Sequence, residues 1–153
     1  MKRTLLTLVI AFGMVSGIFA DATWLTDHKQ ATEIAKKDQK PILMLFTGSD
    51  WCGYCMKLDK EFFSQQDFKE FAQSDIVLLE VDFPKNKKLD ATTTAQNKKL
   101  AKKYGIRGYP TIYIVDADGE VIYQTGYGEF VKAKSAENYI KILKEKIAAK
   151  AKK

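Results

Sequence analysis

The feature that most constrains this chain is the WCGYC segment at positions 51–55, which holds the only two cysteines among 153 residues. The apolar run Ile42–Phe46 precedes it and is typical of a buried strand. After the first cysteine the spacing becomes helical, with Cys55, Leu58 and Phe62 on one stripe. The two cysteines are therefore expected where a strand ends and a helix begins.

That position favours a reactive thiol at Cys52. The first N–H groups of a helix lack intrahelical partners, and the positive end of the helix dipole stabilises an anion there. A thiolate in such a place has a pKa below the free value of about 8.5. Cys55 follows one helical turn later on the inward stripe, close enough to close a small disulfide ring. Cys52 is therefore interpreted as the catalytic nucleophile and Cys55 as the resolving thiol.

The alternatives to redox chemistry are a metal site, a purely structural disulfide and two inert core cysteines. A structural zinc site takes about four ligands, whereas the chain adds only one histidine, His28, far from the pair in sequence. A disulfide across so short a loop constrains little chain entropy. Gly53 and Tyr54 between the cysteines would pack poorly in a core. No metal or cofactor is expected, and His28 is interpreted as a surface or capping residue.

The N-terminus has the pattern of a signal peptide. A basic start precedes the stretch 5–20, which carries no charge and is mostly apolar. An uncleaved anchor helix needs about 20 apolar residues, more than this stretch provides. Small residues at its end predict a signal peptide over 1–22, cleaved after Ala20 or Ala22. The remainder, 23–153, is predicted to be a single domain, and the protein is expected in the periplasm.

The composition argues against nucleic acid as a partner. Loss of Lys2 and Arg3 with the signal peptide would by itself lower the formal net charge from +6 to +4. The lysines lie on predicted helix faces and loops, without arginine clusters interleaved with aromatic residues. Outside the cytoplasm, a single pair of cysteines indicates one working dithiol rather than a disulfide-stapled scaffold.

Hydrophobic periodicity and capping residues predict the order of helices and strands. Helices are predicted from 26 or 27 to 37, at 52–63, 68–72 and 93–104, and after Ser135 with fraying over 148–153. Strands are predicted at 42–46, 76–82, 112–115 and 120–124, the last two joined by a hairpin turn at 116–119. Asp67 is expected to cap the third helix, and a capping box from Thr93 to Gln96 the fourth. Residues 126–128 are expected to form a loop. This order predicts an α/β fold with a small mixed sheet.

Four sequence features in order resemble the thioredoxin fold. They are the buried strand, the WCGYC segment, the Gly-Tyr-Pro-Thr stretch at 108–111 that opens a later strand, and Gly126 beyond the hairpin. The similarity covers about 24–147, nearly the whole mature chain. The segment 41–63 particularly resembles the exported thioredoxin-like proteins of bacteria, a group that includes the periplasmic reductase domains of disulfide-reducing systems. The resemblance implies a central mixed four-stranded sheet with helices on both faces.

The resemblance also implies which residues contact a substrate. In that fold the strand opened by Pro110 lies beside the strand that leads to the first cysteine, and the matching proline bond is cis, so Pro110 would face the sulfurs. The backbone of Tyr109 would stay free to pair with an extended substrate. Trp51 and Tyr54 are expected to form an apolar rim around the sulfurs, and Gly53 completes the expected substrate-binding residues.

One position departs from the family's pattern. The frequent buried acid lies six residues before the first cysteine, where this chain has Phe46. The proton acceptor for the resolving thiol must therefore be another group, and Asp50, Glu80 and water are the alternatives. The dipeptide between the cysteines, at 53–54, is the pair seen in periplasmic disulfide isomerases. The dimerisation domain of those isomerases is not expected here, and the protein is predicted to be a monomer.

The predicted reaction is thiol–disulfide exchange that reduces the disulfides of exported proteins. The residues between the cysteines supply no cation to the thiolate, so a moderately reducing potential, below about −200 mV, is expected. A membrane-bound electron donor is the expected partner. The alternatives are a disulfide isomerase or oxidase with the same site, and a non-catalytic module that binds a metal or a peptide through its thiols.

Overall fold

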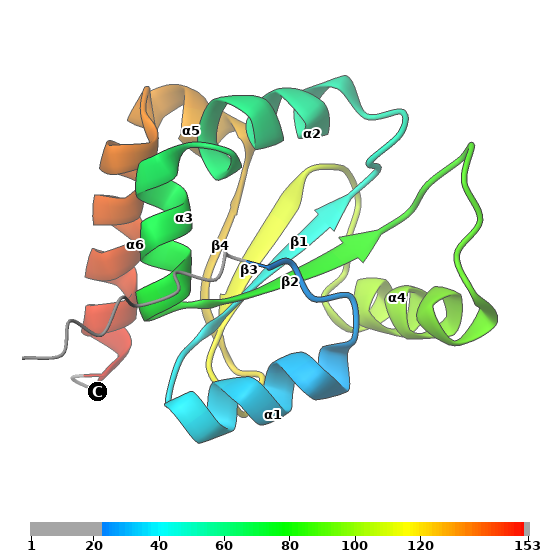
Figure 1. Ribbon diagram of the computed structural model, residues 1–153, viewed down its shortest axis with the longest axis horizontal. Coiled ribbons are helices and arrows are strands. Elements are labelled where there is room, and N and C mark those ends of the chain that lie inside the picture. Colours follow the sequence, from blue (N-terminus) through cyan, green and yellow to red (C-terminus); the bar gives the residue numbers. More distant parts are fainter. Residues whose placement is uncertain (1–22, 152–153) are drawn as a thin grey trace, which may run out of the picture.

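The computed structural model describes residues 23–151, which form helices and four strands (Figure 1). The predicted signal peptide, 1–22, lies outside these residues. The helices are α1 (His28–Asp38), α2 (Gly53–Leu58), the π-helical segment η1 (Asp59–Phe63), α3 (Gln66–Asp75), α4 (Ala91–Lys103), α5 (Tyr127–Ala133) and α6 (Ala136–Ala151). The strands are β1 (Ile42–Thr47), β2 (Val77–Asp82), β3 (Thr111–Val115) and β4 (Val121–Gly126). None of the helices in this part of the chain combines the length and the apolar character needed to cross a bilayer.

The four strands form one mixed sheet in the order β2-β1-β3-β4. β1 is parallel to β2 and antiparallel to β3, and β3 is antiparallel to β4. In register, Leu45 of β1 lies opposite Glu80 of β2, and Phe46 lies opposite Val81. Because successive side chains of a strand point to opposite faces, Leu45 and Glu80 share one face of the sheet while Phe46 and Val81 share the other. The predicted mixed four-stranded sheet is confirmed.

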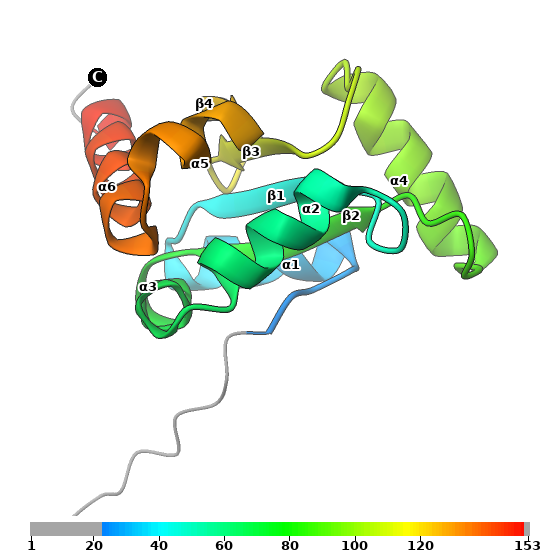
Figure 2. The ribbon, with the colours of Figure 1, turned by 90° about the horizontal axis from the view of Figure 1, so that it is seen from above.

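Two hydrophobic layers cover the sheet. The layer of α2, η1, α3, α5 and α6 takes from the strands Leu43, Leu45, Leu78, Ile112 and Ile114. The layer of α1 and α4 takes from them Ile42, Met44, Phe46, Val77, Leu79, Val81, Tyr113 and Val115. Figure 1 shows α3, α5 and α6 grouped on one side of the strands and α1 and α4 on the other. Seen from above, α2 crosses over β1 and β2 (Figure 2). The prediction of helices on both faces is therefore confirmed.

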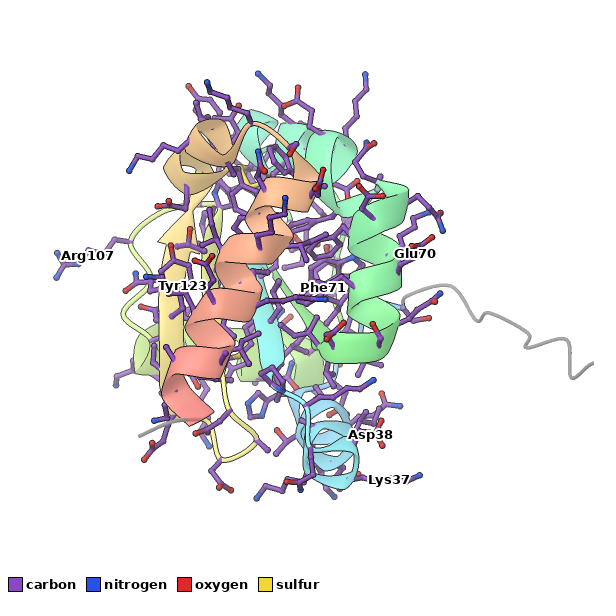
Figure 3. The ribbon with its side chains drawn as sticks, turned by 90° about the vertical axis from the view of Figure 1, so that its left-hand side faces the viewer. Lys37, Asp38, Glu70, Phe71, Arg107 and Tyr123 are labelled. Atoms are coloured by element: carbon purple, nitrogen blue, oxygen red, sulfur yellow. A yellow bond between two sulfur atoms is a disulfide. The ribbon has the colours of Figure 1, made fainter. Side chains whose placement is uncertain are left out.

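The longest helix, α6, closes the first layer. Tyr139 and Leu143 on its inner face are fully buried. Phe71 of α3 points toward α6, whereas its neighbour Glu70 points away into solvent (Figure 3). The ammonium of Lys144 on α6 lies 5.5 Å from the centroid of the Phe71 ring. The C-terminal helix thus anchors the layer that carries α2.

Two predicted helix caps are wrong. Gln65 is the N-cap of α3, so Asp67 falls in the first turn, where its charge still complements the positive end of the helix. α4 is capped by Asp90, whose carboxylate accepts the Thr93 N–H at 2.9 Å. The predicted capping box fails because the side chain of Gln96 hydrogen-bonds the segment before α1 instead.

Several element boundaries also differ from the prediction. The helix that follows Cys52 is α-helical only to Leu58 and continues as the π-helical η1. α3 is longer than predicted. α6 continues as a helix through 148–151, which were expected to fray, and 152–153 lie outside the described residues. The predicted loop 126–128 is instead the last residue of β4 and the first two residues of α5, although two of its three residues are glycines. Tertiary packing overrides that weak local propensity, because Phe130 of α5 is fully buried and its ring lies 3.9 Å from that of Tyr139.

Candidate active site

The two cysteines lie where β1 passes into α2, as predicted, and they form a disulfide. Cys52 is the N-cap of α2. Its sulfur accepts the Cys55 N–H at 3.2 Å, and its own N–H donates to the Gly48 carbonyl at 2.8 Å. Both cysteines are 6% exposed. The Cys52 sulfur thus accepts a backbone N–H at the start of a helix, a placement that stabilises a thiolate once the bond is reduced.

Trp51, one residue of the predicted rim, packs over the turn before the disulfide. A Cβ on Gly48 would overlap the Trp51 indole, so the close approach requires glycine. The indole N–H donates to the Phe83 carbonyl at 2.8 Å, and the ring meets Tyr109 edge-on with centroids 5.7 Å apart. The Lys85 ammonium lies 4.0 Å from the centroid of the indole ring. Sequence analysis missed Phe83 and Lys85 because their contacts with Trp51 are not local.

Tyr54 is the other residue of the predicted rim and is 63% exposed. Its ring packs against Tyr127 of α5, with centroids 4.7 Å apart. Tyr127 also hydrogen-bonds the Lys57 side chain, and this bond raises the pKa of Lys57. Gly53 begins α2 and has open space where a Cβ would stand. Tyr127 was missed because its glycine-flanked position predicted a loop.

The Tyr109–Pro110 peptide bond is cis, as the resemblance implied. Pro110 is buried and precedes β3, the strand that pairs with β1. A Cβ on Gly126 would come within 3.2 Å of the Pro110 carbonyl oxygen, which accounts for the glycine beyond the hairpin. Burial raises the pKa of Tyr109. The contact of Pro110 with the sulfurs and the pairing of Tyr109 with a substrate stay predictions.

Asp50 ties the turn before the disulfide to the loop after β2. Its carboxylate accepts the backbone N–H groups of Lys85, Asn86 and Lys87 at 2.9, 2.6 and 3.0 Å. These bonds, that of Lys85 first, lower the pKa of Asp50. Figure 1 shows this loop rising beside the turn that leads into α2. Asp50, one of the three candidate proton acceptors, therefore serves the loop on the outer side of the disulfide.

Asp82, at the end of β2, makes a second tie to the same turn. This buried carboxylate accepts the Ser49 N–H at 2.9 Å and the Ser49 hydroxyl at 2.6 Å. The Lys87 ammonium lies 2.9 Å from Asp82 Oδ2, the oxygen that also accepts the Ser49 hydroxyl. The Asn97 side chain donates to the Asp82 carbonyl at 2.9 Å. Sequence analysis gave Asp82 no role, and the one available signal was an acid at the end of an apolar strand.

A cavity of about 260 Å³ lies on the inner side of the disulfide. The residues that line it are Trp24, Leu45, Thr47, Ser49, Cys55, Met56, Asp59 and Glu80. Phe46, at the family's acid position, is absent from this lining because its side chain packs in the layer of α1 and α4. Of the two carboxylates considered from the sequence, Glu80 shares the cavity with Cys55, and Asp50 does not.

Glu80 is a partly buried carboxyl in the middle of β2. Burial, followed by the negative charges of Asp82 and Asp59, raises its pKa, and the positive charge of Lys87 opposes this shift. The Glu80 backbone N–H donates to the Leu25 carbonyl at 2.8 Å, so a short N-terminal segment pairs alongside β2 at this point.

His28 lies apart from the disulfide. It begins α1, which packs in the layer opposite α2, and its backbone N–H donates to the Gln96 side chain at 2.9 Å. Burial, followed by the charge of Lys103, lowers the pKa of its imidazole. Between residues 23 and 151, no three His, Cys, Asp or Glu side chains are grouped so that they could hold a metal ion.

Comparison with known proteins gives relatives named for disulfide chemistry. The disulfide bond reductase DsbH of Chlamydia pneumoniae is 33% identical over 108 residues, which cover 71% of this chain and 64% of the relative. Among solved structures, a DsbH oxidoreductase has a TM-score of 0.68 at 29% identity and covers 88% of this chain and 94% of that one. A disulphide isomerase from Xylella fastidiosa Temecula1 has a TM-score of 0.57 at 26% identity and covers 88% of this chain and 98% of that one.

The match to the Chlamydia pneumoniae reductase spans less than two thirds of that relative's length. The family described as the thioredoxin-like domain matches residues 28–145, from the start of α1 into α6. This range contains the disulfide, the rim, the cis proline and Glu80. The strand order and the helices on both faces are those of the thioredoxin fold. The chain therefore belongs to the thioredoxin-like domain family.

Proposed function

We propose that this protein is an exported thiol:disulfide oxidoreductase that reduces the disulfides of other exported proteins. The observation that carries the proposal is the Cys52–Cys55 disulfide at the start of α2, with the Cys52 sulfur accepting the Cys55 N–H at 3.2 Å. A relative that is 33% identical is named a disulfide bond reductase. The signal-peptide pattern of residues 1–22 supports export and a periplasmic location.

The reaction begins from the reduced dithiol. The Cys52 thiolate attacks one sulfur of an exposed substrate disulfide, and the other substrate sulfur leaves as a thiolate. Cys55, one helical turn away and 6% exposed, then attacks the Cys52 sulfur of the mixed disulfide. The substrate leaves with both of its sulfurs reduced, and the protein is left with the Cys52–Cys55 disulfide.

The rim around the disulfide supplies the contacts for an extended substrate. Trp51 and Tyr54 lie on its two sides and are 37% and 63% exposed. Pro110 lacks a backbone N–H, and Tyr109 offers its backbone to a substrate strand beside β3. Gly53, with open space at its Cα, lets the substrate backbone approach the first turn of α2.

Each turnover consumes two electrons, which must come from another dithiol. Thioredoxin and glutathione keep thiols reduced in the cytoplasm, and their supply does not extend to an exported protein. A membrane-bound dithiol donor that carries electrons outward is therefore the proposed partner, and the protein is proposed to act as a monomer.

The test is reduction of insulin disulfides by the mature protein with a dithiol donor. Cys52→Ser is expected to abolish turnover because it removes the nucleophile. Cys55→Ser is expected to retain the first step and to accumulate a mixed disulfide visible on a non-reducing gel. A protein that binds peptides or metals through its thiols without catalysis would show no insulin reduction in the unmodified chain.

A disulfide isomerase is the second candidate, favoured by the likeness to the Xylella fastidiosa structure. Equilibration with glutathione measures the reduction potential of the Cys52–Cys55 pair and so distinguishes a reductase from an isomerase. A potential below about −200 mV supports the reductase, and a value well above it supports an isomerase or an oxidase. Reactivation of a scrambled multi-disulfide protein without added reductant would also favour the isomerase.

A further inference from the structure

The cavity on the inner side of the disulfide places a carboxyl group near the resolving thiol. We propose that Glu80 accepts the proton of the Cys55 thiol, across the cavity that both side chains line, before Cys55 attacks the mixed disulfide. The proposal rests on the proposed function, since it concerns the second step of the same exchange. A buried thiol is a poor nucleophile until it loses its proton, because the thiolate is the reactive form.

The position of this carboxylate follows from the register of the sheet. Leu45 on β1 and Glu80 on β2 are direct neighbours, share one face and line the same cavity as Cys55. Phe46 points to the other face of the sheet, so a carboxylate at position 46 would not reach the cavity. A carboxylate can face Cys55 from either member of the Leu45–Glu80 pair. In this chain β1 contributes a leucine, and the acid comes from β2.

The other carboxylates near the disulfide have different surroundings. Asp82 is held by the Ser49 N–H, the Ser49 hydroxyl and the Lys87 ammonium. Asp50 accepts three backbone N–H groups of the loop after β2. Asp59 lines the cavity from η1 but is exposed to solvent. Glu80 is the carboxylate that combines partial burial with a place beside Cys55.

The charges around Glu80 favour its acting as a base at neutral pH. Asp82 on its own strand and Asp59 on η1 are negative, and Lys87 from the loop after β2 is positive. Burial and the two acids raise the pKa of Glu80 against the effect of Lys87. A carboxyl whose pKa moves upward comes closer to that of a thiol, and proton transfer is most efficient when the two values approach each other.

The cavity that this pair lines is partly open and has both apolar and polar walls. Trp24 forms one side, and its ring packs edge-on against Phe63 with centroids 5.2 Å apart. The hydroxyls of Thr47 and Ser49 add polar groups to the lining. A volume of about 260 Å³ exceeds the roughly 30 Å³ that one water occupies. A proton can therefore pass from Cys55 to Glu80 through a water held by these groups.

The step balances without any further reagent. The Cys55 proton goes to the Glu80 carboxylate, and the thiolate attacks the Cys52 sulfur. The Cys52–Cys55 bond forms as the bond from Cys52 to the substrate breaks. The electron pair leaves on the substrate sulfur, which takes a proton from solvent. Glu80 gives its proton back to Cys55 when a dithiol donor reduces the disulfide again.

The test isolates the resolving step in the mature protein. Cys52 of the reduced protein is allowed to react with an aromatic disulfide that releases a coloured thiolate at each step. The first release reports attack by Cys52, and the second reports attack by Cys55. Glu80→Gln is expected to slow the second release near pH 7 by roughly 100-fold, the lower end of what a positioned general base contributes. The first release should stay unchanged.

The pH profile distinguishes a proton acceptor from a merely structural group. The second release in the unmodified protein should fall as pH drops through the pKa of Glu80 and vary little above it. In Glu80→Gln the rate should climb steadily with pH and approach the unmodified protein where Cys55 ionises unaided. Glu80→Asp, which keeps the carboxyl, should recover part of the rate. Asp59→Asn is the matched control. It should keep the rate near pH 7, and the fall in acid should move to slightly lower pH because one charge that raises the pKa of Glu80 is lost.

A double variant, Leu45→Glu with Glu80→Leu, moves the carboxyl group from β2 to the paired position on β1. It is expected to restore the neutral-pH rate that Glu80→Leu alone loses. Equal profiles for Glu80→Gln and the unmodified protein would overturn the proposal, as would a larger effect from Asp59→Asn. Both outcomes leave insulin reduction intact, whereas an unmodified protein that fails to reduce insulin refutes the proposed function itself.

Discussion

The two sides of the Cys52–Cys55 disulfide differ in how their polar groups are paired. On the outer side, Asp50 accepts three hydrogen bonds that join the turn 48–51 to the loop 83–87, and Asp82 accepts two that join the same turn to the end of β2. On the inner side, Glu80 lines a cavity, and burial together with neighbouring acids raises its pKa. The carboxylates of the outer side therefore fix the conformation of the turn before the disulfide. The inner side keeps a carboxyl at a cost to stability, and such costs are typical of functional groups.

Substitution of Asp82 is expected to give the largest loss of stability on the outer side of the disulfide. Asp82→Ala removes the acceptor of the Ser49 N–H and hydroxyl and is expected to lower the free energy of unfolding by about 2–3 kcal/mol, because bonds to buried charged groups are strong. Urea unfolding of the oxidised protein measures the loss. Lys87→Gln is the matched control. It keeps both Ser49 bonds and removes only a half-exposed ion pair, so it should cost less than about 1 kcal/mol. Equal losses of unfolding free energy in the two variants would show that the Ser49 hydrogen bonds are not what makes Asp82 stabilising.

Gly48 tests the packing of the rim with an effect of intermediate size. A Cβ at this position would overlap the Trp51 indole. Gly48→Ala is therefore expected to displace the ring from Phe83 and to cost roughly 1–2 kcal/mol of stability through overpacking. The emission of Trp51, recorded in a Trp24→Phe background, should shift as the indole moves toward water. The cost should shrink when Gly48→Ala is combined with Trp51→Ala, and an undiminished cost would refute the steric explanation.

Asp50 tests the loop that borders the rim, with a smaller and local effect. Asp50→Asn is expected to speed amide hydrogen exchange at Lys85, Asn86 and Lys87, whose N–H groups its carboxylate accepts. Because the pKa of Asp50 is lowered in the fold, its contribution is present above the unfolded pKa and is lost as pH falls through the folded value. The stability difference from the variant should therefore vanish in acid. Unchanged exchange at these amides would show that other contacts hold the loop.

The same contrast explains what the sequence could predict. The disulfide pair, the buried strand before it and the hairpin rest on local patterns, and all three are confirmed. The cis bond before Pro110 followed from the family resemblance and is also confirmed. The Asp50 and Asp82 ties were not predicted because they join segments separated by more than thirty residues. Such contacts depend on register and loop path, which leave no periodic signal.

The search for an acid near Cys55 shows that a shift of one residue along β1 changes which face of the sheet a side chain occupies. Counting six residues back from the first cysteine gives Phe46, yet the strand places Phe46 on the far face and Leu45 on the near one. Glu80 was one of three alternatives because the sequence alone could not align β2 against β1. The parallel pairing of Leu45 with Glu80 supplies that missing alignment. α5 was missed for a similar reason, because its position depends on the burial of Phe130.

Glu80 gives the smallest of these stability effects, and its sign is opposite to that of the outer carboxylates. The fold raises the pKa of Glu80, so the unfolded chain releases this proton first as pH rises. The native state then binds more protons than the unfolded state, and stability falls with rising pH between the unfolded and the folded pKa. Glu80→Gln has no proton to lose there. The variant should match the unmodified protein near pH 4 and become slightly more stable at neutral pH, as measured by urea unfolding of the oxidised proteins. A variant that is less stable at neutral pH would place Glu80 among the structural carboxylates, alongside Asp82.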